Sequence, residues 1–125
     1  MEENEIGQRV LGLAIKVHKA LGPGLLESAY ETCLAYELGE AGFIFERQLL
    51  LPLHYAGIVI EQGYRLDLLV MRRVVLEIKT VDKLVDVHRA QLLRYLKLGG
   101  YRLGYLLNFN VSTMRDGIVR MANGL

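Results

Sequence analysis

Hydrophobic residues recur every three or four positions over the first 21 residues, which is the spacing of an amphipathic helix. Asn4 is suited to cap its start, and its apolar positions are Ile6, Val10, Leu13, Ala14, Val17 and Leu21. Gly22-Pro23-Gly24 then ends the pattern, because proline disfavours helix at the residue before it. A second helix is expected from about Leu25 to Gly39 or Gly42, with a buried stripe of Leu26, Ala29, Tyr30, Cys33, Leu34 and Leu38.

Beyond residue 42 the pattern changes to that of β-strands. One strand is expected over residues 43–55, ending near Pro52, and a second over residues 58–70. Ala56-Gly57 supplies the turn between them. Gly63, inside the second strand, indicates a bulge or bend.

The rest of the chain alternates strand and helix. A turn at 71–73 leads to a strand at 74–80, a helix at 86–98 with Leu92, Leu93 and Leu96 inward, and a strand at 101–109. The last strand is so apolar that both of its faces should be covered. After a turn at Asp116-Gly117, a short edge strand is expected. The order α-α-β-β-β-α-β predicts one α/β domain over residues 1–125, a mixed sheet flanked by helices.

Composition agrees with a folded domain of this kind. The chain has 125 residues, of which 52% are apolar and 23% charged, enough to bury a core without cross-links. No apolar run approaches the roughly 18 residues that span a bilayer, and Met1-Glu2-Glu3-Asn4-Glu5 is acidic, unlike a signal peptide. The single cysteine, Cys33, excludes an intrachain disulfide. We therefore expect a cytoplasmic protein that does not enter the membrane.

Charge is distributed unevenly along the chain. Residues 1–64 carry four basic and nine acidic side chains, a net charge of −5, whereas residues 65–102 carry nine basic and four acidic, a net charge of +5. A positive half suits a polyanionic partner such as nucleic acid. Ordinary solvated surface charge would give the same numbers, so the asymmetry supports a nucleic-acid partner without separating the two explanations.

Three charged residues interrupt the apolar strands in the middle of the chain. Strand alternation places Arg65, Asp67 and Leu69 on one face of the strand at 58–70, with Tyr64, Leu66, Leu68 and Val70 on the other. In the next strand Glu77 and Lys79 share a face. Burying an unpaired carboxylate costs several kcal/mol, so Asp67 and Glu77 need a partner.

A divalent cation is a better partner for the two acids than Lys79 alone. Mg²⁺ is bound by a few carboxylate oxygens together with waters and substrate phosphate, and Mn²⁺ could replace it. Such an ion removes the repulsion between Asp67 and Glu77 and lowers the pKa of bound water. The alternative is a cross-strand salt bridge on a solvated face, worth under about 1 kcal/mol. The local pattern leaves both open.

The helix that follows carries a polar stripe, His88, Gln91 and Tyr95, at spacings i, i+3 and i+7. Gln91 and Tyr95 could donate to a phosphate or to a metal-bound water. The commoner alternative is a helix flank on which the glutamine is solvated and the tyrosine packs.

Four segments of the sequence form an ordered set: Val17-His18-Lys19-Ala20-Leu21-Gly22-Pro23-Gly24-Leu25-Leu26-Glu27, continuing to Tyr30, then Gly63-Tyr64-Arg65-Leu66-Asp67, Glu77-Ile78-Lys79 and Gln91-Leu92-Leu93-Arg94-Tyr95. Together they resemble the GxxExxY protein family of the PD-(D/E)xK nuclease superfamily. The ordered set covers almost the whole chain and is far more specific than any one motif. It implies a restriction-endonuclease-like mixed sheet flanked by helices.

The resemblance also implies roles for individual residues. Glu27 resembles the helix acid that assists metal binding, Asp67 and Glu77 the metal-binding acids, and Lys79 the catalytic lysine. Gln91 and Tyr95 resemble the Gln-x-x-x-Tyr pair of the exonuclease-like branch. Leu66 stands where the superfamily's name places proline, a departure that does not touch the chemistry.

Some of these assignments have simpler alternatives. Glu27 falls in the first turn of its helix, where any carboxylate gains from the backbone dipole. His18 and His88 are candidates for supporting the site, but a lone helical histidine is more often packed or at the surface.

The hypothesis that follows is a Mg²⁺-dependent nuclease acting on nucleic acid, with DNA expected in preference to RNA. One alternative is a catalytically silent nucleic-acid-binding or regulatory module that uses the same groove, with a partner protein or a second copy gripping the substrate. Another is a dimerising scaffold that makes contact through residues 49–53 or the C-terminal segment. Fold resemblance alone does not decide between them.

Overall fold

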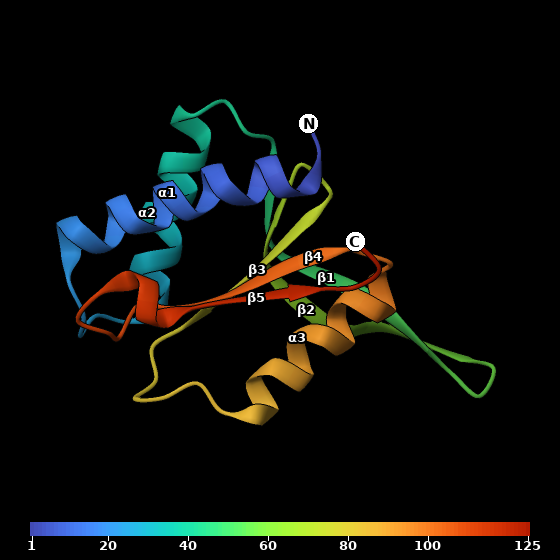
Figure 1. Ribbon diagram of the computed structural model, residues 1–125. Coiled ribbons are helices and arrows are strands. Elements are labelled where there is room, and N and C mark those ends of the chain that lie inside the picture. The colour runs from blue at the N-terminus through green and yellow to red at the C-terminus, as the bar shows by residue number, and fades with distance from the viewer.

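The computed structural model describes residues 1–125 as helices packed on both faces of one five-stranded sheet. Helices α1 (Glu3–Leu21) and α2 (Glu27–Glu40) cover one face, and α3 (Asp86–Gly99) covers the other (Figure 1). This is the mixed α/β arrangement expected of a restriction-endonuclease-like fold. No helix is both long and apolar enough to cross a membrane.

The strands lie in the sheet in chain order: β1 (Phe45–Tyr55), β2 (Ile58–Val70), β3 (Val74–Lys79), β4 (Leu103–Asn108) and β5 (Ile118–Ala122). Neighbouring strands are antiparallel except β3 and β4, which are parallel and joined through α3. A short 3₁₀ helix, η1 (Met114–Gly117), precedes β5. The expected final edge strand is thereby confirmed.

Apolar side chains form a separate cluster on each face of the sheet. The larger lies under α1 and α2 and includes Tyr30, Leu34 and Leu76, all fully buried. The smaller lies under α3 and includes Val75, Leu92 and Leu96. All six residues of β4 are buried, which confirms that this strand is covered on both faces.

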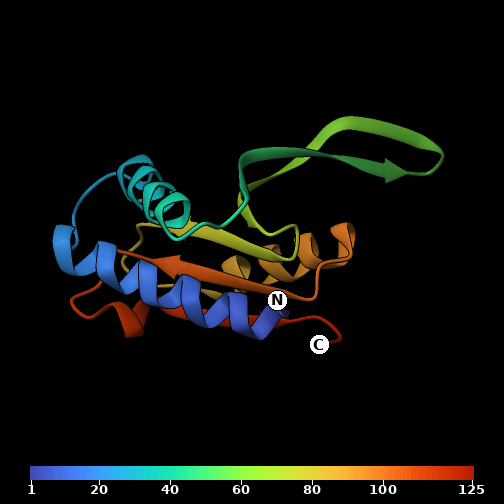
Figure 2. The ribbon, with the colours of Figure 1, turned by 90° about the horizontal axis from the view of Figure 1, so that it is seen from above.

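The hairpin of β1 and β2 extends well beyond the rest of the sheet (Figure 2). Its register shifts between Leu51 and Leu53, and a Cβ added at Gly63 would collide with the Cβ of Leu53. The bulge predicted at Gly63 is therefore confirmed. The prediction that the first strand ends near Pro52 was wrong, because β1 is an edge strand and tolerates a residue that cannot donate a ladder hydrogen bond.

The expected alternation of faces along β2 also fails at one point. Leu68 and Val70 pack in the cluster under α1 and α2, but Leu66 and Tyr64 belong to the cluster under α3. The ribbon therefore turns over near Asp67. Opposite this point, Gln48 of β1 has a left-handed backbone, with φ of 50°, which breaks the pleat.

Three details of the helices differ from expectation. Asn4 does not cap α1: the cap is Glu2, whose backbone N–H donates to the Glu5 carboxylate, and Asn4 lies inside the helix. Leu26 is 76% exposed, because its extended backbone precedes the first turn of α2. Ala29, Cys33 and Leu93 are partly rather than fully buried.

Candidate active site

Strands β2 and β3 separate at the centre of the sheet, and two carboxylates bridge the opening. Backbone pairing covers Val70↔Val74, Leu69↔Val75 and Leu68↔Leu76 and then stops. Asp67 and Glu77 come next. The N–H of Ile78 donates to Asp67 Oδ2 at 2.8 Å, and the N–H of Asp67 donates to Glu77 Oε2 at 2.9 Å. Side chains thus replace the backbone partners that a continuous ladder would supply.

The two acids lie in an unfavourable electrostatic environment. Glu77 is only 4% exposed, and burial, with the neighbouring Asp67 charge as the second cause, raises its pKa to about 8. Burial also raises the pKa of Asp67, although the hydrogen bond from the Ile78 N–H opposes this. The protein alone therefore favours a proton on the pair. A cation between them would reverse that preference.

Helix α3 supplies the polar groups on one side of the acids. Lys79 Nζ donates to Gln91 Oε1 at 3.3 Å. Burial raises the pKa of Tyr95, and the charges of Glu77 and Asp67 raise it further, which places its hydroxyl within their field. The Tyr95 ring stacks on Tyr64 with centroids 5.2 Å apart.

Helix α2 forms the other side, across a pocket of about 350 Å³. Seven residues line it: Glu27, Ser28, Glu31, Gln48, Arg65, Asp67 and Ile78. Glu27, in the first turn of α2, is exposed and has no ion pair. Arg65 is likewise without an ion pair, and its charge acts to lower the pKa of both Asp67 and Glu77.

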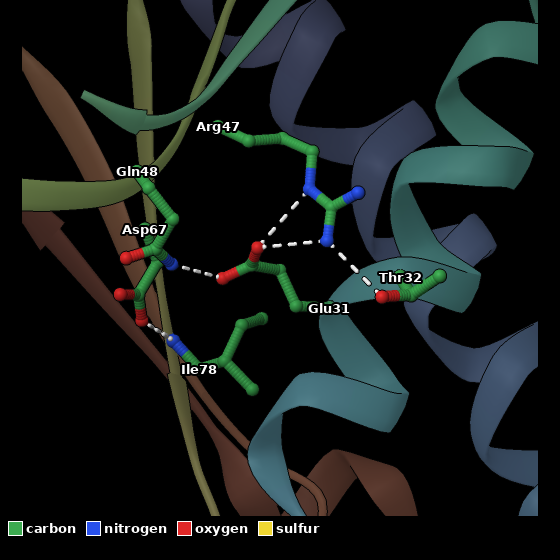
Figure 3. A network of polar contacts seen from close by, with 6 residues as sticks. All are labelled: Glu31, Thr32, Arg47, Gln48, Asp67 and Ile78. Atoms are coloured by element: carbon green, nitrogen blue, oxygen red, sulfur yellow. Dashed lines mark hydrogen bonds and ion pairs between the residues drawn. The ribbon is translucent and has the colours of Figure 1, made fainter.

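Glu31, one helical turn beyond Glu27, is buried and tied to β1 (Figure 3). Its Oε2 accepts from Arg47 Nε at 3.1 Å, and its Oε1 accepts from Gln48 Nε2. Arg47 also donates to Thr32 Oγ1 at 3.1 Å. Because both of its carboxylate oxygens are engaged, Glu31 is not free to bind an ion as the structure stands.

A comparison with protein-family models identifies the chain. The model described as the PD-(D/E)XK nuclease superfamily matches residues 4–121. The chain belongs to the PD-(D/E)XK nuclease superfamily. No curated protein and no solved structure matches it.

Nucleases of this superfamily generally use divalent metal ions and bind nucleic acid, so we tested whether the acid pair could hold such an ion. No group of three or more His, Cys, Asp or Glu side chains is arranged to hold one. However, Asp67 and Glu77 each use one oxygen for a backbone N–H, and Oδ1 of Asp67 and Oε1 of Glu77 accept no hydrogen bond. Two carboxylate oxygens, completed by water and phosphate, are a set that Mg²⁺ accepts. The residues fit.

The two histidine candidates lie outside this PD-(D/E)XK site. His18 is buried, with Nε2 2.7 Å from the carbonyl oxygen of Val111, so it holds α1 to the segment before η1. His88 Nδ1 accepts from the N–H of Val85 at 3.0 Å and so caps the start of α3. Neither histidine is hydrogen-bonded to Asp67, Glu77 or Lys79.

Three residues around the acids escaped the sequence reasoning. Strand alternation had placed Arg65 beside Asp67, but nothing singled it out. Glu31 follows Glu27 at the i+4 spacing of one helix face, and this spacing is the sequence signal that indicates it. Gln48 had no signal, since its importance depends on a left-handed backbone that its sequence does not suggest.

Proposed function

We propose that the protein is a Mg²⁺-dependent nuclease, with Mn²⁺ as a substitute ion, that hydrolyses phosphodiester bonds. The observation that carries the proposal is the pair of carboxylates across the β2–β3 opening, each with one free oxygen. The charge of Lys79 acts on both, lowering the pKa of each carboxyl. When bound, the ion would polarise a phosphoryl oxygen and lower the pKa of a bound water.

The chain's own residues would hold the ion and orient the water and the phosphate. Asp67 and Glu77 would hold the ion with the carboxylate oxygens that accept no hydrogen bond. Lys79, directed by Gln91, supplies a point charge that orients the attacking water or neutralises the phosphate oxygens. Gln91 and Tyr95 orient the phosphate from α3, and Arg65 offers a planar guanidinium to it from the opposite side.

Finer assignments belong to the same proposal. We assign the chain to the GxxExxY group on the motif Gly24-Leu25-Leu26-Glu27-Ser28-Ala29-Tyr30. Glu27 forms no three-acid group with Asp67 and Glu77, but it has no ion pair and lines the same pocket as Asp67, so we assign it the role of assisting the ion rather than that of a third direct ligand. DNA is the proposed substrate in preference to RNA. The cytoplasm is the proposed compartment, in keeping with a single thiol.

The test is cleavage of labelled single- and double-stranded DNA and RNA in Mg²⁺, Mn²⁺, Ca²⁺ or chelator. We expect cleavage in Mg²⁺ and Mn²⁺ only, lost in Asp67→Ala and Lys79→Ala. Lys97→Ala is the matched control, because Lys97 is an exposed lysine in the last turn of α3 with no ion pair.

Cleavage that survives in Lys79→Ala would contradict the proposal and point to a contaminant. If the wild type binds nucleic acid tightly in chelator and cleaves nothing, the protein is instead a silent binding module of the same fold.

A further inference from the structure

The middle of β1 contains a residue in a conformation that strands do not use. Gln48 has φ of 50°. Its neighbours pair as Arg47↔Leu68 and Leu49↔Leu66, so Gln48 lies opposite Asp67. A non-glycine residue in the left-handed region is strained and persists only where its surroundings hold it.

Glu31 is what holds it. One oxygen of the Glu31 carboxylate accepts from the Gln48 side chain and the other from Arg47, so two successive residues of β1 are fastened to one residue of α2 (Figure 3). Glu31 is 7% exposed. A buried carboxylate with both oxygens occupied anchors its neighbours rather than binding a ligand.

The strained backbone of Gln48 lies opposite Asp67, at the point of the hairpin that sets the direction of the Asp67 side chain. At this point of the hairpin Leu68 faces the cluster under α1 and α2, whereas Leu66 faces the cluster under α3. No extra residue is inserted here, because the pairing keeps the same register on both sides of Gln48. The left-handed backbone nevertheless interrupts the pleat, and such irregularities increase the local twist and change the direction of nearby side chains. Asp67, between the two leucines, carries the carboxylate that accepts from the Ile78 N–H on β3.

We propose that Glu31 is a positioning residue of the acid pair: by fixing the left-handed bend at Gln48, it directs the Asp67 carboxylate across the β2–β3 opening. The effect of Glu31 on ion binding and cleavage rests on the proposed nuclease function. The geometrical part of the inference, which is that Glu31 sets the direction of the Asp67 carboxylate, does not.

The geometrical part is tested by hydrogen exchange at the Ile78 amide, whose protection reports the bond to Asp67. Glu31→Ala should lower that protection by about fivefold or more, the weight of one ordinary hydrogen bond, and leave the β4 amides unchanged. Glycine adopts a positive φ without strain, so adding Gln48→Gly should restore the protection. Glu37→Ala is the matched control, because Glu37 also pairs α2 with a cation, Lys16, but lies outside the pocket.

The functional part is tested by Mn²⁺ titration of the same variants. Loss of a residue that orients a metal ligand costs about tenfold or more in affinity, so Glu31→Ala should show that loss and Glu31→Ala/Gln48→Gly should recover most of it. If Glu31 acted only through its charge, the glycine would rescue nothing, and the proposal would be overturned. Unchanged Ile78 protection in Glu31→Ala would overturn it as well.

The two readouts separate this inference from the proposed function. Ile78 protection that behaves as expected in a protein that neither binds Mn²⁺ nor cleaves would refute the nuclease and keep the positioning role. Should Glu31→Ala not fold, Glu31→Gln replaces it. Its amide oxygen still accepts from Gln48 but not from Arg47 as well. We therefore expect a smaller loss of Ile78 protection, which Gln48→Gly should again reverse. No loss in Glu31→Gln, or a loss that the glycine does not reverse, would refute the positioning role.

Discussion

Glu77 carries the main electrostatic cost of the site. Its carboxylate is almost fully buried and faces a second acid, while the nearest cations, Lys79 and Arg65, lower its pKa only in part. A charge in this position without full compensation is destabilising by several kcal/mol. The ion-free protein is therefore expected to keep a proton on Glu77 at neutral pH, and ion binding should release it.

This arrangement predicts the pH dependence of stability. The pKa of Glu77 is about 8 in the folded protein against the ordinary 4.5, so the folded state holds a proton that the unfolded state has released. The stability it contributes is present at low pH and is lost as pH rises from about 4.5 to about 8. In chelator, the melting temperature should be several degrees lower at pH 9 than at pH 5.

Glu77→Gln is the control for that measurement, because it removes the titrating group and keeps the shape. Most of the difference in melting temperature between pH 5 and pH 9 should disappear in the variant. An equal difference in wild type and Glu77→Gln would contradict the assignment.

Tyr95 is expected to act as a hydrogen-bond donor. Burial first, and then the charges of Glu77 and Asp67, raise the pKa of its phenol, so the hydroxyl keeps its proton. Tyr95→Phe should therefore reduce cleavage about tenfold, as for one lost hydrogen bond to a charged group, with Mn²⁺ affinity unchanged. A variant that cleaves as the wild type does would limit Tyr95 to its stack on Tyr64.

At the scale of the elements, the turn between β2 and β3 sets the pairing of the two strands that carry Asp67 and Glu77. Met71 and Arg72 both have positive φ, 54° and 56°, the geometry of a tight hairpin turn that favours glycine. Arg72 is exposed. Arg72→Gly should therefore raise the free energy of unfolding by about 0.5–1 kcal/mol, measured by urea denaturation. A destabilised variant would mean that the Arg72 side chain makes a contact worth more than the relieved strain.

The periodicities of the sequence predict most of the elements and part of the site. The strand period of two predicts that Glu77 and Lys79 share a face, and helical spacing predicts that Gln91 and Tyr95 do. The structure adds the contact between these pairs, a hydrogen bond from Lys79 to Gln91. Where prediction failed, a local conformation overrode the period. The left-handed Gln48 reversed the faces of Tyr64 and Leu66, and the extended backbone of Leu26 removed it from the helix stripe. The importance of Glu31 lies in its contact with that same bend, which no residue pattern reveals.

At the scale of the whole molecule, the basic half of the chain, residues 65–102, forms the end of β2, all of β3 and α3 (Figure 1). These elements carry the acid pair and form the α3 side of the site. A nucleic acid held there should release counterions, so binding should weaken steeply with salt.

This predicts the salt dependence of binding in Ca²⁺, measured with a fluorescent oligonucleotide. Arg65, which lines the pocket beside Asp67, is expected to contact one phosphate, so Arg65→Ala should lower the slope of log affinity against log salt by about one. Arg72→Ala removes the same charge at the far end of β3 and should leave the slope unchanged. Equal slopes for the two variants would contradict a phosphate contact at Arg65.

The most direct measurement is the anomalous signal of Mn²⁺ soaked into crystals of the wild-type protein above pH 8. The account predicts a peak between Asp67 Oδ1 and Glu77 Oε1, absent in Asp67→Ala. A wild-type crystal with no peak there, or with manganese bound elsewhere, would contradict the claim that the half-buried Asp67 and the buried Glu77 exist to hold a divalent ion.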